Sequence, residues 1–544
     1  MHRRDFFSFF YSSCSERYTS SECATSTEHP HIAADITPQQ HAKEHALQQN
    51  TLEPYAQPLD YRRALHLVRR LSFAAPYSLV QQLVGKTAQE AVDIVLGTSA
   101  TTPQPQSTPG AWIHDITENP EKADRDTRNE IYSRWYTQFA SLQSWWVNLM
   151  LREAFPAREK LVLFWSGHFT SEFAFDDMYN PPQLLFRQNQ TLRKHCVGDM
   201  RQLTEDITLD GAMLNYLGGT LNTKGSPNEN YARELLELFT TGLAAYTEGD
   251  IKEAARTLTG WRASRFNDEP RPNGNYITYF VPSAHDTGAK QFLGVTIPAR
   301  EADANTELLV RSGEVRRLID IIFEQRPQEV SRFLCTKLYR FFVYANPSVR
   351  ADAVIAQMAV VFRRSNYHIL PVLRALCASA HFFDESVIGV QIKTPAEFVI
   401  GLARQLDANP SQAVRTMNAL EQVLMDPPTV AGWESYRSWI STTTYPLRVQ
   451  YAQELIRNIS NEHVTMWARQ FPNAESARAL VNSIGEFLFP KPLSQSRLQG
   501  YLSTLLSGAP EYEWASIMRD THAAGTRIKF LLARMAQAPD IQLC

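Results

Sequence analysis

The stretch from Lys224 to Leu243, KGSPNENYARELLELFTTGL, holds the densest set of residues that could do chemistry. On a helix, residues four apart share a face, and one face would carry the charged ladder Glu229, Arg233 and Glu237. Asn230 and Glu234 repeat this spacing beside it, and Asn228 is suited to accept hydrogen bonds from the first N–H groups of the helix. Such a face is either a salt-bridged scaffold or, where partly buried, a site for a metal or polar ligand.

His168 ends the stretch REKLVLFWSGH, whose middle part, LVLFW, is apolar. It follows Trp165 by three residues and Phe164 by four, so a continuous helix would project its ring from the apolar face. A histidine in such a place is either a core residue with its hydrogen bonds satisfied or a metal ligand.

His285 and Asp286 come together in the segment HDTGAKQFLG, and Lys290 follows them. Asp before Thr-Gly is common in turns, which is the simpler interpretation. A neighbouring His and Asp on a loop can also supply metal ligands or acid–base groups, and the lysine could hold an anionic group.

Three more side chains are candidates for ligand binding. His66 and Arg69 share a helix face with Arg70, and the two arginines could clamp a carboxylate or sulfate, or instead pair with the Glu229–Glu237 ladder. Trp433 follows a glycine and could offer its flat face to a sugar, although large helical cores use such residues for packing.

One hypothesis joins these groups in a single polar site, because each is costly to bury alone and cheaper if they satisfy one another. His168 and His285, with Glu229 or Asp286, would then bind a divalent metal, and Arg233 would orient an anionic substrate group. This predicts a metal-assisted hydrolase whose catalytic residues are Glu229, Arg233, Glu234 and Asp286. A self-satisfied polar core without catalysis explains the same residues.

The bulk composition excludes several classes of function. The 544 residues carry 54 basic and 57 acidic side chains, so no strong field exists to recruit nucleic acid or acidic lipid. The six cysteines include no CxxC pair, and no run of 18 apolar residues could span a membrane as a helix. Nucleotide-binding, zincin and serine-hydrolase motifs are missing in a convincing context.

The elements that must position these residues are predicted to be helices. Apolar residues recur at helical spacing in Ile131, Trp135, Phe139, Leu142, Trp146 and Leu149. Similar patterns cover Tyr231–Gly242 and Gly313–Tyr344, among others. The segment YITYFVPSAHDTGAKQFLGVTIP differs, with β-branched and aromatic runs around Pro, Asp and Gly. We expect a mainly α fold with one small β-hairpin or irregular excursion.

Composition divides the chain into three parts. Residues 1–54 are polar with little periodicity and are expected to be a flexible leader, followed by a helical core at 55–455 and a helical C-terminal segment at 456–544. Arg3-Arg4 resembles the start of a twin-arginine export signal, but its apolar part is only FFSFFY. We interpret it as a degenerate or absent signal, and expect a cytoplasmic protein, with export to the periplasm as the alternative.

The chain resembles the bacterial family known as domain of unknown function 1800. The resemblance rests on HLVRRLSFA, REKLVLFWSGHFT, PNENYARELLELFTTG, YTEGDIKEAARTLTGW, HDTGAKQFLG, KTPAEFVIGLARQL and PPTVAGWESYRSWI, which occur in the family's order over about residues 60–455. It implies a large, mostly helical protein of unestablished activity. Such proteins are often encoded beside a sulfatase-like or alkaline-phosphatase-like protein, so the resemblance predicts an accessory or binding partner of such a protein.

Two positions depart from the family pattern. The family's Trp-His-Asn-His-Phe is Trp165-Ser166-Gly167-His168-Phe169 here, so the first histidine is missing. Phe239 stands where a histidine is common in the family. A metal site that needed those histidines would be weakened. We therefore place the accessory role first and the metal-assisted hydrolase second.

Overall fold

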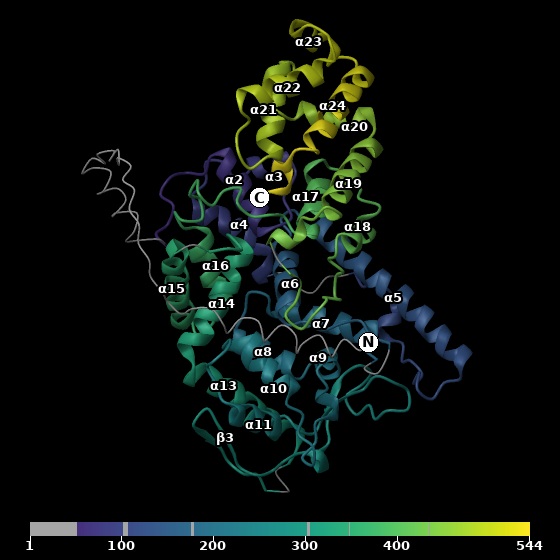
Figure 1. Ribbon diagram of the computed structural model, residues 1–544, viewed down its shortest axis with the longest axis vertical. Helices are drawn as coiled ribbons and strands as arrows, with labels where there is room; N and C mark the ends of the chain where they lie inside the picture. The colour runs from purple at the N-terminus through teal and green to yellow at the C-terminus, as the bar shows by residue number, and fades with distance from the viewer. Residues whose placement is uncertain (1–51, 102–106, 176–178, 302–304, 348, 435) are drawn as a thin grey trace, which may run out of the picture. The chain divides into compact units, whose positions relative to one another are not determined.

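The computed structural model describes residues 52–101, 107–175, 179–301, 305–347, 349–434 and 436–544, and Asn50–Cys544 form one compact unit. Helices dominate these residues, and the strands among them form two short antiparallel pairs (Figure 1). The predicted mainly α fold with a minor β part is confirmed. Arg3-Arg4 and nearly all of the expected leader lie outside the described residues.

The first half of the described chain contains ten α-helices and one π-helix. They are α2 (Tyr61–Leu71), α3 (Tyr77–Gln81), α4 (Ala88–Thr101), α5 (Arg125–Arg152), α6 (Ala157–His168), α7 (Pro182–His195), α8 (Met200–Thr208), α9 (Gly211–Tyr216), α10 (Asn230–Glu234), the π-helix η4 (Leu235–Thr240) and α11 (Glu248–Thr257). Short 3₁₀ turns are η2 (Ala111–His114), η3 (Gly219–Leu221) and η5 (Pro282–Ala284).

Two hairpins follow where the sequence predicts one excursion. β1 (Trp261–Ala263) pairs with β2 (Thr278–Phe280), and β3 (Lys290–Phe292) pairs with β4 (Val295–Ile297). Leu293 and Gly294 form the β3–β4 turn, and both have positive φ, as a two-residue hairpin turn of this hand requires. β1 was missed because helical spacing predicts a helix over Asp250–Trp261, whereas α11 ends at Thr257 and Trp261 begins the strand.

The second half is again helical. It contains α12 (Glu307–Val310), the π-helix η7 (Arg311–Val315), α13 (Arg316–Gln325), α14 (Pro327–Phe342), α15 (Val349–Arg364), α16 (Ile369–Cys377), α17 (Pro395–Gln405), α18 (Ala413–Ala419), α19 (Thr444–Asn458), α20 (Asn461–Arg469), α21 (Ala477–Leu488), α22 (Gln495–Leu506), α23 (Trp514–Ile517) and α24 (Thr521–Met535). The 3₁₀ turns are η8 (Tyr436–Trp439), η9 (Glu511–Glu513) and η10 (Pro539–Gln542).

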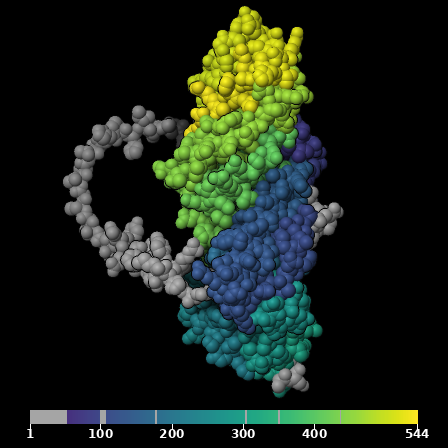
Figure 2. Space-filling model, turned by 90° about the vertical axis from the view of Figure 1, so that its right-hand side faces the viewer, coloured from purple at the N-terminus to yellow at the C-terminus, as the bar shows by residue number. Residues whose placement is uncertain are grey.

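Helices α6 and α17 lie in the core. Every residue of α17 is buried, and so is every residue of α6 except Gly167. α6 packs against α4, α5 and α7, whereas α17 packs against α5, α18 and α19. Helix α5 also contacts α18, and in Figure 2 the blue surface of the α5 region adjoins the green surface of later helices. Because both helices also carry charged residues, those charges must find partners inside the protein.

Candidate functional site

The motif that opens with Asn-Glu-Asn folds as α10 and continues directly into the π-helix η4. Asn228 anchors its start, because its Oδ1 accepts from the Asn230 N–H at 3.0 Å and its own N–H donates to Asn222 Oδ1 at 3.0 Å. At the far end the Thr240 and Thr241 hydroxyls donate to the carbonyls of Leu235 and Leu236. π-turns within helices are frequent at functional sites.

The charged ladder forms as predicted, and it lies at the surface. Arg233 is 3.6 Å from Glu229 and 3.8 Å from Glu237. Its main partner is Glu248, at the start of α11, which it binds through two parallel hydrogen bonds of 2.9 and 2.8 Å. The side chains of Arg233 and Glu229 are 34% and 35% exposed, and that of Glu248 is 67% exposed. Sequence spacing could not reveal Glu248, which comes from another helix.

Glu234 is the unpaired carboxylate of the motif. It is partly buried and has no hydrogen bond or ion pair with any residue that the structure describes. Burial and the neighbouring Glu237 raise the pKa of Glu234 to about 7, against the lowering effect of Arg233. Near neutral pH the side chain is therefore poised between its neutral and charged forms.

His168 contacts the end of this motif rather than its start. Its Nε2 lies 3.0 Å from the Phe239 carbonyl, and its Nδ1 lies 3.0 Å from Lys337 Nζ, which also donates to the Leu238 carbonyl at 2.8 Å. Burial and the Lys337 charge lower the pKa of His168 well below its usual value, so the ring is neutral and Nε2–H is the donor to Phe239. Burial lowers the pKa of Lys337 to about 8. The pair satisfies carbonyls that the end of η4 leaves free.

His285 belongs to a separate buried cluster around Glu314, in η7. Its Nδ1 lies 2.9 Å from the Thr259 carbonyl and its Nε2 lies 3.3 Å from Glu314. Lys290 and Arg300 bind the same carboxylate at 2.7 and 2.8 Å. Burial alone would raise the pKa of Glu314, but hydrogen bonds from these three groups hold it at about 2.

Asp286 is held next to that cluster by its own partners. Its carboxylate accepts from Arg256 Nε at 2.8 Å and from the Gly288 N–H at 2.9 Å, and its carbonyl accepts from Lys290. Burial opposes ionisation, yet Arg256 and these bonds lower the pKa of Asp286. The turn predicted from Asp-Thr-Gly is present, and Lys290 binds a carboxylate of the protein itself.

The expected gathering of His168, the Asn-Glu-Asn start and His285-Asp286 into one site does not form. Each histidine is engaged at both ring nitrogens by different partners, and the described residues contain no group of three or more His, Cys, Asp or Glu that could hold a metal ion. Lys290 and Arg300 neutralise Glu314, which leaves that carboxylate unsuited to a metal. Lys337 and Glu314, the charged partners of the two histidines, give no signal in the sequence.

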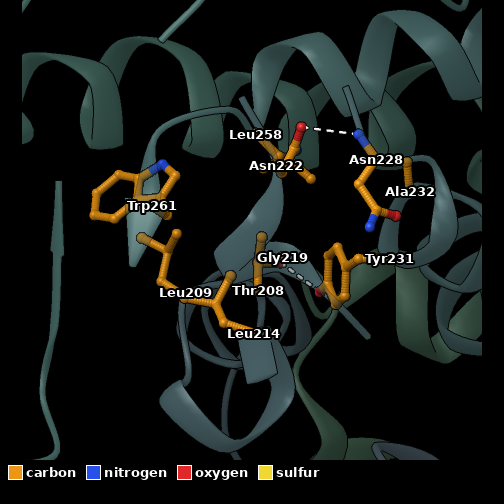
Figure 3. Close-up of a pocket in the computed structure, with 10 residues that line it drawn as sticks. All are labelled: Thr208, Leu209, Leu214, Gly219, Asn222, Asn228, Tyr231, Ala232, Leu258 and Trp261. Atoms are coloured by element: carbon orange, nitrogen blue, oxygen red, sulfur yellow. Dashed lines mark hydrogen bonds between the residues drawn. The ribbon is translucent and has the colours of Figure 1, made fainter. Parts of the chain in front are cut away.

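One small cavity adjoins the motif (Figure 3). Asn228 and Tyr231 lie on one side of it and Trp261 on the other, and its volume of about 10 Å³ has room for one water molecule. The Tyr231 hydroxyl is 2.8 Å from Thr208 Oγ1, whereas Trp261 Nε1 has no hydrogen-bond partner among the described residues. A bridging water would satisfy that indole.

The remaining candidates for ligand binding lie elsewhere. His66 Nε2 is 3.1 Å from the Phe382 carbonyl, and burial and Arg70 lower the pKa of His66 to about 3. Arg69 donates to the Phe487 carbonyl, whereas Arg70 lies 3.6 Å from Glu397 of α17, so an interhelical ion pair does form but not with the ladder of α10. Trp433 packs its ring against Gly167 of α6, as its packing interpretation predicts.

Comparison with known proteins identifies a family for this chain. Residues 66–543 match the family described as protein of unknown function DUF1800. No curated protein and no solved structure matches the chain. In the part of the chain that the structure describes, no helix has the length and apolar character to cross a membrane. Since the family match covers most of the sequence, this chain belongs to the DUF1800 family.

Proposed function

We propose that this protein is a helical binding partner of another protein, and that the acidic face of α10, η4 and α11 is its contact surface. The face comprises Glu229, Glu234, Glu237 and Glu248 around Arg233. Four carboxylates against one guanidinium give it a negative charge, which favours a basic partner surface.

The unpaired, partly buried carboxylate of Glu234 is the main observation that supports the proposal. A partly buried carboxylate without a partner is costly to ionise, and a cation from another molecule would offset that cost. The carboxylates around Arg233 are connected yet partly exposed, so they can exchange partners without unfolding the motif. The resemblance to the family suggests a sulfatase-like or alkaline-phosphatase-like protein as the partner.

Co-purification tests this proposal. A tagged wild-type chain is expected to retain the proposed partner at low salt and to lose it at high salt, because exposed charges are screened. Glu248→Lys should abolish retention. Glu324→Lys is the matched control, because Glu324 of α13 likewise accepts two hydrogen bonds, both of 2.9 Å, from Arg317 of the same helix. A partner that is never retained, or one lost equally with both variants, would remove the support for this role.

A metal-assisted hydrolase is the second candidate. A carboxyl group with a pKa near neutrality is suited to general acid–base catalysis, which favours Glu234 in such a role. The roles assigned from sequence to Glu229, Arg233, Asp286, His168 and His285 stay predictions. Elemental analysis of the wild type beside His168→Ala and His285→Ala decides between the two functions. Stoichiometric metal lost in both folded variants would favour the hydrolase, and metal-free protein with merely less stable variants would favour the binding partner.

A further inference from the structure

A second polar cluster, built from other residues, lies where α2, α6 and α17 approach one another. Its cations, the cation cluster, are Arg69, Arg70, Lys160, Lys393 and Arg448, each at most 6% exposed. The segments HLVRRLSFA, REKLVLFWSGHFT and KTPAEFVIGLARQL supply four of them. The ion pairs of the described residues join this cluster to one carboxylate, that of Glu397. Five basic side chains therefore have one carboxylate partner among the described ion pairs, and Arg70 Nη1 also donates to Cys544 Sγ at 2.7 Å.

Glu397 is already fully engaged. Its Oε1 accepts from Lys160 and lies 3.6 Å from Arg70 Nη1, and its Oε2 accepts the Thr394 N–H at 2.7 Å as part of the capping box of α17. Arg70 also donates to carbonyls at the end of α14. Glu397 thus neutralises the Lys160 side of the cluster, and it forms no ion pair with Arg69, Lys393 or Arg448 among the described residues.

Three cations of the cluster bind carbonyl groups but have no carboxylate partner among the described residues. Lys393 Nζ donates to the Ile541 carbonyl at 2.8 Å, and Arg448 Nη1 donates to the Lys393 carbonyl at 3.0 Å. Arg69 Nε and both Nε and Nη2 of Arg448 are buried without any acceptor in the described part of the chain. Burial and the nearby Arg69 lower the pKa of Lys393 to about 7. An unpaired buried cation is costly, so this arrangement calls for an anion.

A cavity lies among these groups. Its polar lining comes from Arg69, Ser72, Lys393, Glu397, Gln405 and Cys544. Its volume of about 10 Å³ has room for one water-sized particle. Sulfate and phosphate carry several oxygens and are too large, whereas a chloride ion is a single atom and exceeds water in size by far less.

We propose that this cavity binds a chloride ion between Arg69 and Lys393. The ion accepts from the Arg69 guanidinium and the Lys393 ammonium, and the positive field of the cluster outweighs repulsion from Glu397, whose oxygens already have donors. Bound chloride links α2 to the start of α17. Because chloride binds the folded chain only, it stabilises the fold by mass action.

Thermal and urea unfolding in chloride test the site, with sodium gluconate as the control for ionic strength. Chloride at about ten times its dissociation constant should raise the folding equilibrium constant about tenfold, with saturation, and gluconate should not. Lys393→Met should lose the chloride response. Lys529→Met, a partly exposed lysine bound only to the Arg457 and Ile459 carbonyls among described residues, should keep it.

Anomalous diffraction from crystals soaked in bromide locates the ion directly and does not depend on any variant folding. A bromide peak between Arg69 and Lys393 would establish the site. Equal stabilisation by gluconate, or bromide absent from the cavity, would overturn it, and so would an oxyanion found there in place of the halide. The outcome is independent of the acidic contact face.

Discussion

His168 and His285, the two predicted metal ligands, each have a protein partner at both ring nitrogens. His168 joins Lys337 to the end of η4, and His285 joins Thr259 to Glu314. Residue types and spacing identify these side chains as buried and polar, but they cannot identify partners more than a hundred residues away, as Lys337 is from His168. At this scale the informative residue is Glu234, which is left without a partner.

Replacing Glu234 with glutamine should change the pH dependence of stability. Its pKa of about 7 lies above the usual 4.5, so its contribution is fully present below pH 4.5 and is lost as the pH rises through 7. Because the side chain is partly exposed, we expect Glu234→Gln to be about 1 kcal/mol more stable than wild type near pH 8 and equal to it near pH 4.5. Urea unfolding at the two pH values measures this. A constant difference would contradict the shifted pKa.

Glu314 should contribute to stability in the opposite sense. Its pKa of about 2 lies below the usual 4.5, so its contribution is present above pH 4.5 and is lost as the pH falls towards 2. This loss should be about 3 kcal/mol in wild type and should be missing in Glu314→Gln, which is already less stable at pH 7 because Lys290 and Arg300 lose their partner. Parallel acid denaturation curves for the two proteins would show that the cluster is not ionised as described.

The His168–Lys337 pair and the Glu314 cluster each involve a π-helix, η4 and η7 respectively. η4 ends at the carbonyls that His168 and Lys337 bind, and η7 carries Glu314. Apolar periodicity predicted one regular helix at Tyr231–Gly242 and another at Gly313–Tyr344. The first contains a π-turn, and the second breaks at Arg326 before Pro327, because proline starts the new helix α14. One inserted residue leaves the apolar spacing of a helix recognisable. The sequence therefore predicts the helices but not the π-turns within them.

Gly242 closes η4 in a conformation that other residues avoid. Its φ is +76°, and an added Cβ would lie 3.0 Å from the ring of Phe333. We expect Gly242→Ala to cost about 1–2 kcal/mol in urea unfolding. Gly500→Ala is the matched control, because Gly500 lies within α22 with no atom within 4 Å of an added Cβ, and it should be neutral or slightly stabilising. Equal effects of the two changes would show that the end of η4 is not constrained.

For the molecule as a whole, the sequence predicts the mainly α class and the family. The family match continues to residue 543, well beyond the 455 to which the quoted segments extend, and α24 and α21 contact α19 and α2. The division at 455 stays a prediction, as does the role of Arg3-Arg4. The cation cluster could not be assembled from sequence, because its members are separated by up to several hundred residues along the chain.

Binding calorimetry between the purified chain and the proposed sulfatase-like or alkaline-phosphatase-like partner tests the contact face most directly. If a partner cation pairs with Glu234, binding must ionise this carboxyl, so wild type should bind about tenfold more tightly near pH 8 than near pH 6. Glu234→Gln should bind with the same affinity at both pH values. A wild-type affinity that is independent of pH, or a pH dependence that persists in Glu234→Gln, would contradict the proposed function.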